Sequence, residues 1–434
     1  MRILTANGTT RPSAAALFGR FRQIIQSLVA STLIGLPTPA LVRAEVPYLE
    51  MLHLWATDEE HFALDAFGQA VRRMGVDWQE QVTTTNFTGV KSILSERLTL
   101  GVPPTAVQWI GGREDVLALH DAGVFRLISS EHFDNLRLEG MRPEIAEIVS
   151  HQDGYLLLPT GIHLLSHVIY NQDVLDAIGA EVPQDWDAFI AAAEAAREAG
   201  YFGLAISDER WQLRNLMHGL LISELTLAGF RSLTVDFDEQ GFEIRDVERA
   251  FQSLRRLQPL ANPNEAELPW AEAVGLTASG RAMASVIGDF ASPLLPEDGN
   301  FTCGLPPGND YYLWAFDTFA LVDLAEPAAI AGQRALVSAV SDPANQTLYI
   351  TRKGGIPAFQ GVDSSALNGC SQVSASIWES SRPRLFLPSR AWTQNMNVIS
   401  NVARTFWRDP QMTAQDAAER VTEKLSALSL LEKS

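Results

Sequence analysis

The stretch Tyr48–Ile110 decides the fold class, because strand and helix patterns alternate along it. Short strand patterns occur at YLEMLHLW (48–55), DWQEQV (77–82) and AVQWI (106–110). Between them, apolar residues recur at helical spacing over 59–74 and 88–100. Strands that alternate with helices predict a parallel sheet covered by helices, so we expect an α/β fold.

The alternation begins again further along the chain. Strand patterns at 163–170 and 201–206 enclose helical patterns at 174–178 and 186–198, and an apolar run at 313–322 precedes a helical pattern at 327–340. The chain from 366 onward is mostly helical in pattern. We expect two lobes, in which residues 45–158 plus 311–352 form the N-terminal lobe and residues 159–310 plus 353–434 form the C-terminal lobe.

Residues 1–44 have the pattern of a signal peptide. They contain five arginines and no acidic residue, and the 13-residue run Ile24–Leu36 is mostly apolar. This run is too short to span a bilayer, and Val42-Arg43-Ala44 predicts cleavage before Glu45. A mitochondrial presequence and a membrane anchor are the alternatives. Because no cysteine lies near this cleavage point for a lipid anchor, we expect a free periplasmic protein.

The charge balance argues against nucleic acid as a partner. The chain has 33 basic and 52 acidic residues, and removing residues 1–44 would leave 28 basic against the same 52 acidic residues. Such acidity disfavours binding to nucleic acid or to an anionic membrane surface. The two cysteines, Cys303 and Cys370, can form one disulfide in an oxidising compartment, and they are too few for a structural zinc site.

Short strings of turn and aromatic residues follow one another in a characteristic order. The strings are Leu54–Glu60, Gly101–Gln108, Asp153-Gly154-Tyr155, Ile162-His163, Tyr170-Asn171, Pro183–Phe189, Trp211-Gln212, Gly280–Met283, Gly288-Asp289-Phe290 and Lys353–Ala358. In this order and spacing the chain resembles extracellular solute-binding protein family 1, and in particular its glucose/mannose-binding branch.

The resemblance implies a type II-like periplasmic-binding-protein fold, with hinge strands joining two lobes that close over a sugar. It further implies a monomer that delivers a small saccharide to an ABC transporter permease, with no catalytic residue, cofactor or metal. A related protein that senses sugar for a membrane receptor is the alternative, and the sequence does not separate the two.

A pyranose offers an apolar ring face and a rim of hydroxyls, so its site needs aromatic faces together with hydrogen-bonding groups. In α/β sheets a cleft opens at the ends of the strands. The family pattern and these strand ends together place such residues on the two opposite walls of the expected cleft. The predicted ligand-binding residues are Trp55, Glu60, Gln108, Trp109, His163, Trp211, Gln212, Asp289 and Lys353.

Several of these residues also have an ordinary structural interpretation, and a lone histidine such as His163 is usually structural. Trp55 and Trp211 can be core aromatics, and Glu60 can be an acidic residue in a helix first turn, which the helix dipole favours. Asp289 and Lys353 can form a surface ion pair or a turn cap. Trp270 is a further aromatic candidate for the site.

The chain departs from the glucose/mannose pattern on one side of the expected cleft. Where the branch usually carries tryptophan, asparagine, arginine, asparagine and tryptophan, this chain has Leu54, Gly161, Leu164, Ser166 and His167. Amide and guanidinium donors are therefore lost, so a sugar derivative or a disaccharide is an alternative to glucose.

Enzyme motifs are absent from the sequence. It contains no Gly-x-Ser-x-Gly, no His-Glu-x-x-His and no glycine-rich phosphate loop. The adjacent carboxylates Asp58, Glu59 and Glu60 cannot face each other across a glycosidic bond. A metal site at His163 and His167, which share one face of the predicted strand 163–170, remains an alternative.

Overall fold

The computed structural model describes residues 46–83, 86–110, 112–131, 133, 138–386 and 389–432. The predicted signal peptide, residues 1–44, lies outside the described residues. In the described part of the chain, no helix combines the length and the apolar character that a membrane span needs.

The largest sheet has seven strands and confirms the α/β prediction. Its order is β12-β7-β11-β3-β1-β2, and β13 pairs with β11. The strands are β1 (Tyr48–His53), β2 (Asp77–Val82), β3 (Ala106–Trp109), β7 (Leu158–Leu164), β11 (Tyr312–Leu321), β12 (Ile356–Pro357) and β13 (Arg384–Leu385). As predicted, β1 lies parallel to both β2 and β3.

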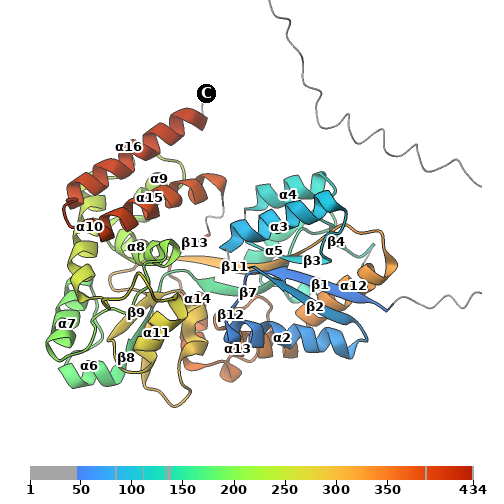
Figure 1. Cartoon of the computed structure of the whole chain (residues 1–434), viewed down its shortest axis with the longest axis horizontal. Coiled ribbons are helices and arrows are strands. Elements are labelled where there is room, and N and C mark those ends of the chain that lie inside the picture. The colour runs from blue at the N-terminus through green and yellow to red at the C-terminus, as the bar shows by residue number, and fades with distance from the viewer. Residues whose placement is uncertain are drawn as a thin grey trace, which may run out of the picture. The chain divides into compact units, whose positions relative to one another are not determined.

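Strand β7 runs in the same direction as β1, β2 and β3, whereas β11, β12 and β13 run in the opposite direction. Strand β11 lies antiparallel to β3 and β7, and β12 is antiparallel to β7. Helices cover both faces, with α3 and α4 on one side and α2 and α13 on the other (Figure 1). The bounds of the helices around this sheet are α2 (Asp58–Arg73), α3 (Asn86–Leu100), α4 (Arg113–Asp121), α5 (Pro143–Val149), α12 (Pro327–Ser341), α13 (Pro343–Lys353) and α14 (Gly369–Glu379).

Helix α2 begins at a complete capping box. The Thr57 hydroxyl accepts a hydrogen bond from the Glu60 backbone N–H, and the Glu60 carboxylate accepts one from the Thr57 backbone N–H. Asp58 and Glu59 add negative charge to the first turn, where the helix dipole favours it. The cap therefore fixes Glu60 just beyond the end of β1.

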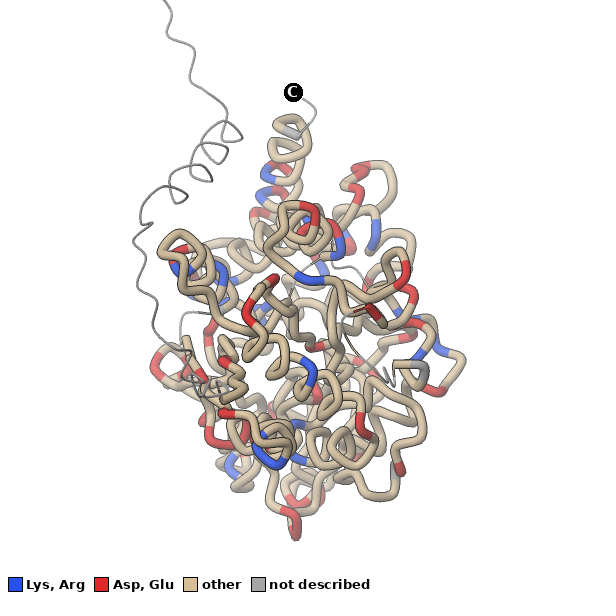
Figure 2. Tube along the Cα trace, turned by 90° about the vertical axis from the view of Figure 1, so that its right-hand side faces the viewer, with Lys and Arg blue, Asp and Glu red and all other residues tan. Residues whose placement is uncertain are grey.

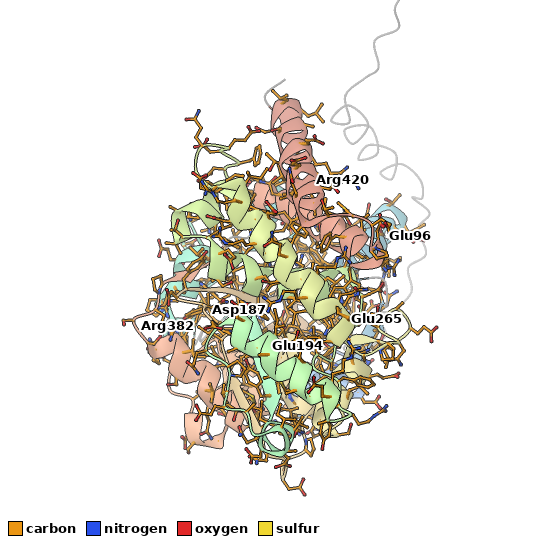
Figure 3. All side chains as sticks on the ribbon, turned by 90° about the vertical axis from the view of Figure 1, so that its left-hand side faces the viewer. Glu96, Asp187, Glu194, Glu265, Arg382 and Arg420 are labelled. Carbon is orange, nitrogen blue, oxygen red and sulfur yellow. A yellow bond between two sulfur atoms is a disulfide. The ribbon has the colours of Figure 1, made fainter. Side chains whose placement is uncertain are left out.

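A second, smaller sheet has the order β10-β8-β9, with antiparallel pairs. Its strands are β8 (His167–Asn171), β9 (Ala284–Ile287) and β10 (Phe301–Gly304). The helices beside it are α6 (Gln172–Ile178), α7 (Trp186–Glu198), α8 (Arg210–Glu224), α9 (Leu227–Thr234), α10 (Ile244–Leu257), α11 (Trp270–Ala278), α15 (Arg390–Arg408) and α16 (Ala414–Glu432). Figure 3 labels Asp187 and Glu194 on α7 and Arg420 on α16, on the charged outer face of these helices.

Short elements complete the chain. The two-residue strands β4 (Ile128–Ser129), β5 (Ser150–His151) and β6 (Gly154–Tyr155) form a third sheet in the order β4-β6-β5. Single 3₁₀ turns are η2 (Leu138–Gly140), η3 (Gln258–Leu260) and η5 (Ser364–Ala366), and η4 (Asp289–Leu294) is longer.

Two large hydrophobic cores correspond to the two lobes. One contains buried residues from 49–164 and 312–378 and lies around the seven-stranded sheet; we call this part the first lobe. The other contains residues from 168–260, 283–286 and 396–425, and we call the part around it and the second sheet the second lobe. A small cluster of Ile169, Val274, Ile287 and Ala291 extends the second lobe towards η4. The predicted boundaries at residues 158, 310 and 352 stay a prediction.

Two strand predictions were wrong in detail. The predicted strand 163–170 is interrupted at Leu165-Ser166, so that β7 and β8 belong to different sheets. The predicted strand 201–206 has only isolated bridges, from Phe202 to Ala282 and from Leu204 to Ala261. The backbone at 202–205 instead makes scattered hydrogen bonds to residues 260–262 and 281–284, too few in one register to count as a strand.

Acidic positions are spread over the face shown in Figure 2, with basic positions between them. No continuous basic tract crosses that face. The arrangement is consistent with the excess of 52 acidic over 33 basic residues in the sequence.

Candidate functional site

Six of the nine predicted ligand-binding residues come together where the first lobe meets η4 and α8 of the second. Trp55, Glu60, His163 and Lys353 lie on the first lobe, and Trp211 and Asp289 lie on α8 and η4. The contacts that join them form three groups: a lysine between two rings, a histidine between two carboxylates, and an aromatic wall.

Lys353 occupies the centre of the first group. Its Nζ lies 3.3 Å from Glu60 Oε1, and the lysine side chain is only 4% exposed. The same nitrogen lies 5.7 Å from the Trp55 ring centroid and 5.3 Å from that of Phe290, within the range of cation–π attraction. The ammonium group therefore links the end of β1, the start of α2 and η4.

His163 is the centre of the second group. Its Nδ1 lies 3.0 Å from Asp289 Oδ1, and its Nε2 lies 3.2 Å from Asp317 Oδ2. Burial lowers the pKa of the imidazole, but the hydrogen bonds and charges of the two carboxylates outweigh it and raise that pKa to about 9. Burial raises the pKa of Asp317, but the hydrogen bond and charge of His163, together with the charge of Lys353, outweigh it, so that this pKa is lowered. The group is therefore an imidazolium between two carboxylates.

The aromatic wall belongs to the second lobe. The rings of Trp211, Trp270 and Phe290 lie edge-to-face or tilted, with centroids 5.8 to 6.0 Å apart. Trp211 donates its indole N–H to Glu209 Oε2 at 2.5 Å, and Glu209 Oε1 accepts the backbone N–H of Trp270 at 3.1 Å. One carboxylate thus orients both tryptophans, and the Phe290 ring reaches His163 at 5.8 Å.

Two glycines allow the segment after α13 to approach both charged groups. Gly354 and Gly355 have φ angles of +78° and +90°, which side-chain-bearing residues rarely adopt. A Cβ at Gly355 would lie 2.6 Å from His163 Nδ1, and one at Gly354 would lie 2.8 Å from the Asp289 carbonyl oxygen. Larger residues at these positions would push Lys353 and η4 apart.

The two walls touch in this structure. The gap lined by Glu60, Trp270, Phe290 and Lys353, with Thr57, Glu59, Pro293, Leu294 and Arg352 around it, has a volume of only ≈ 10 Å³. That is about the space of one water molecule, whereas pockets for small ligands usually measure about 300–1,000 Å³. A ligand can enter here only when the walls separate.

A larger cavity of ≈ 650 Å³ opens beside this gap. It is lined by Phe62, Arg352, Glu297 and Phe301 among others, and by Cys303 and Cys370, which form a disulfide between β10 and α14. Its lining mixes charged, small and apolar side chains, and none of the three rings of the aromatic wall lines it. Because the aromatic rings and the charged groups meet at the closed gap, the gap is the better candidate for a sugar site.

The other three predicted residues have their contacts elsewhere. Gln108 is fully buried and accepts the Leu54 backbone N–H, Trp109 packs between Phe87 and Phe125, and Gln212 accepts the Ser207 backbone N–H. Among the described residues, Gln108 Nε2, Trp109 Nε1 and Gln212 Nε2 are buried and have no hydrogen-bond partner. Their role in ligand binding stays a prediction.

Sequence reasoning missed Phe290, Asp317 and Glu209. Asp317 carried a signal, because it is an acidic residue in the middle of the apolar run 312–321. Phe290 stands next to Asp289 in a string that resembles the family, but nothing in the pattern indicated a contact with four other side chains. Glu209 has no sequence signal, since its role depends on how α8 and α11 are placed.

The alternative metal site at His163 and His167 lacks its structural premise. The two histidines lie on β7 and β8, which belong to different sheets, so they do not share one strand face. Burial lowers the pKa of His167 to about 4 although Asp289 opposes this, and His163 is already occupied by two carboxylates. Among the described residues, neither His163 nor His167 belongs to a group of three ligating side chains close enough together to hold a metal ion.

Comparisons with known proteins agree with this architecture. The model of the bacterial extracellular solute-binding protein family matches residues 65–368. A "probable sugar-binding periplasmic protein" of Brucella suis is 23% identical over 424 residues, covering 92% of this chain and 96% of its own. One with the same description from Rhizobium meliloti is 25% identical over 340 residues, covering 74% and 78%.

Solved structures share the two-lobed fold. A chitin oligosaccharide binding protein superposes with a TM-score of 0.73 at 15% identity, covering 88% of this chain and 98% of its own. The solute-binding protein RafE in complex with raffinose gives 0.70 at 15% identity, covering 88% and 99%. At these identities the likeness concerns the fold alone. Because the family model covers well over half of the sequence, this chain belongs to the bacterial extracellular solute-binding protein family.

Proposed function

We propose that this protein captures a small neutral saccharide between its two lobes and delivers it to an ABC transporter permease from the periplasm. The observation that carries the proposal is the meeting of an aromatic wall, Trp211, Trp270 and Phe290, with the charges of the buried His163 and Lys353 and the partly buried Glu60. Aromatic faces suit the apolar side of a sugar ring, and charged hydrogen-bonding groups suit its hydroxyls.

Charge favours a neutral ligand over a sugar acid. The cluster contains the carboxylates of Glu60, Glu209, Asp289 and Asp317, against the cations of Lys353 and His163. An anionic ligand would therefore meet an excess of negative charge in a buried site. In the described part of the chain, Asp289 Oδ2 is buried and has no hydrogen-bond partner, so a ligand hydroxyl can donate to it.

The relatives support transport and a periplasmic location. Several curated relatives are described as sugar-binding periplasmic proteins, and one from Pyrococcus horikoshii is described as an ABC transporter extracellular-binding protein. A free binding protein that closes on its ligand offers a permease a distinct conformation to recognise. The glucose/mannose branch is a narrower form of this proposal, and the departures at Gly161 and Ser166 favour another neutral sugar.

A thermal-shift and calorimetry screen tests the proposal. Neutral monosaccharides, disaccharides and trisaccharides are compared with sugar acids and polyols, and we expect one neutral class to stabilise the protein. A ligand at 100 times its Kd raises the free energy of unfolding by about 2.7 kcal/mol. For the sugar that binds, Trp211→Ala should weaken affinity about tenfold, equivalent to about 1.4 kcal/mol.

Trp392 provides a matched control. It is a half-buried tryptophan on α15, and it packs beside His218, away from the aromatic wall. Trp392→Ala should lower stability without changing sugar affinity. Binding of sugar acids alone, or equal affinities of the Trp211→Ala variant and the wild type, would place the ligand elsewhere, and the ≈ 650 Å³ cavity would be the next candidate.

A further inference from the structure

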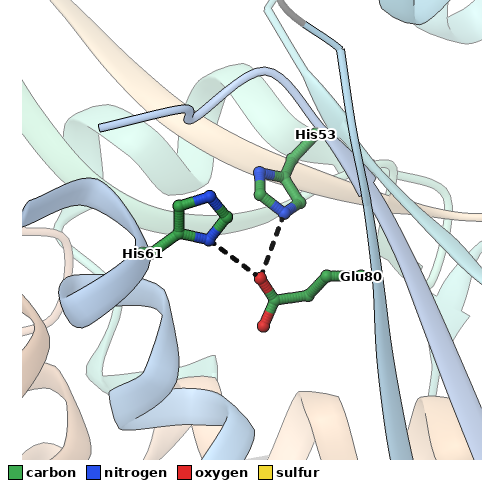
Figure 4. Close-up of side chains that lie close together, drawn as sticks. All are labelled: His53, His61 and Glu80. Atoms are coloured by element: carbon green, nitrogen blue, oxygen red, sulfur yellow. Dashed lines mark hydrogen bonds and ion pairs between the residues drawn. The ribbon is translucent and has the colours of Figure 1, made fainter. Parts of the chain in front are cut away.

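Three side chains outside the sugar cleft converge on one point. His53 is the last residue of β1, His61 lies in the first turn of α2, and Glu80 lies on the neighbouring strand β2. His61 Nδ1 lies 3.2 Å from Glu80 Oε2, and His53 Nε2 lies 3.4 Å from the same oxygen. Figure 4 shows both imidazole rings directed at this carboxylate.

The distances fit a tetrahedral metal ion. Zinc binds histidine nitrogen and carboxylate oxygen at about 2.0–2.2 Å, which places two ligands of a tetrahedron about 3.3 Å apart. The three ligand atoms all lie within 4.8 Å of one another, and the two measured edges are 3.2 and 3.4 Å. Small side-chain rotations would therefore bring all three atoms to bonding distance of one ion.

The His53 ring is otherwise poorly satisfied. It is fully buried, and within the described ranges neither of its nitrogens has a hydrogen bond of good geometry. Leaving a buried polar group without a partner costs about 1–3 kcal/mol. A metal ion bound at Nε2 would remove much of that cost, which the long 3.4 Å approach to Glu80 does not.

A hydrogen bond from Trp78 orients the Glu80 carboxylate. Trp78 donates its indole N–H to Glu80 Oε1 at 2.6 Å, which leaves Oε2 directed at the two histidines. Such outer contacts are typical of metal ligands, because they fix the ligand's orientation. The side chains of His61 and Glu80 are 38% and 22% exposed, so an ion can reach them from solvent.

We propose that His53 Nε2, His61 Nδ1 and Glu80 Oε2 bind a divalent transition-metal ion of the zinc type. Two imidazoles and one carboxylate select such an ion over magnesium or calcium, which prefer oxygen ligands. Three protein ligands leave the fourth position to solvent. The ion joins the end of β1 to the start of α2, the two segments that carry Trp55 and Glu60.

Metal titration of the whole protein tests this site without any sugar. Protein stripped with a chelator is titrated with ZnCl₂ by calorimetry and with CoCl₂ by visible absorption. We expect one ion per chain, and a cobalt spectrum with the intense bands of tetrahedral coordination. His61→Ala and Glu80→Gln should each weaken zinc binding at least tenfold and abolish those bands.

The chain offers a closely matched control in His120 and His151. Their rings have the same 5.6 Å separation and 75° angle as those of His53 and His61, but no third ligand completes a site with them among the described residues. His151→Ala should leave zinc affinity unchanged. The proposal is overturned if the wild type binds no zinc at millimolar concentration, or if the His61→Ala and Glu80→Gln variants, shown to be folded by circular dichroism, bind it like the wild type.

Discussion

Removing the buried charge at His163 should change how stability depends on pH. The imidazole has an ordinary pKa of 6.5 and a folded-state pKa of about 9, because the Asp289 and Asp317 carboxylates outweigh the effect of burial. The folded protein therefore holds this proton more tightly than the unfolded chain. A difference of about 2.5 pKa units corresponds to roughly 3 kcal/mol of unfolding free energy.

Proton linkage determines whether stability rises or falls with pH. Because the folded pKa is raised, the stabilisation is fully present below about pH 6.5 and is lost as the pH rises through about 9. Urea unfolding of the wild type and of His163→Gln is measured at pH 6, 7, 8 and 9.5. Because all other titrating groups are present in both proteins, the difference between their unfolding free energies isolates the contribution of His163. The stability advantage of the wild type should shrink by roughly 3 kcal/mol across the series.

His167→Gln serves as the control for this series. His167 is equally buried, but burial lowers its pKa to about 4 against the opposing charge of Asp289, so it is neutral in the folded state over the same range. Its variant should keep a constant stability difference from the wild type between pH 7 and 9.5. If the stability difference between His163→Gln and the wild type is equally constant between pH 7 and 9.5, His163 carries no proton at neutral pH, and the cluster does not contain an imidazolium.

Three further outcomes are expected. Gly355→Ala should lower the unfolding free energy by about 1–3 kcal/mol in urea melts, because its φ is +90° and its Cβ would lie 2.6 Å from His163 Nδ1. Cys303→Ser, which removes the disulfide to Cys370, should cost about 2–5 kcal/mol by the same measurement, and dithiothreitol should reproduce the loss in the wild type but not in the variant. Lys353→Met should weaken saccharide binding in calorimetry by at least tenfold, because it removes the ammonium group between two rings and leaves Glu60 without its ion-pair partner.

The first half of the fold could be predicted because local patterns determine it. The alternation of period-two and helical patterns over 48–110 specified three parallel strands and two helices, and both parallel pairings are present. The interruption that separates β7 from β8 could not be predicted from local patterns. No charged residue interrupts the run 164–170, and Leu165-Ser166 carries neither glycine nor proline to mark the bend.

The site was only partly predictable for a related reason. Residues at strand ends and turns, such as Trp55 and Lys353, could be singled out because parallel strands open towards a cleft at their carboxyl ends. Trp109 also ends a strand, yet its ring packs with Phe87 and Phe125 in the first core. Position along a strand does not specify on which side of the sheet a side chain packs when both faces are covered by helices.

In the closed arrangement of the two walls one buried carboxylate oxygen lacks a hydrogen-bond partner, and under the proposed function this would let a sugar control closure. The closed gap brings Asp289 against His163, but within the described residues its Oδ2 is buried without a partner. When the walls separate, water can hydrate that oxygen, so closure alone carries the desolvation cost of an unpaired acceptor. A ligand hydroxyl that donates to Oδ2 removes this cost only in the closed arrangement. Such a differential interaction is what allows a ligand to shift a conformational equilibrium. Replacing Asp289 with alanine should therefore weaken affinity and, in the same measure, reduce the extent to which the ligand favours the closed arrangement.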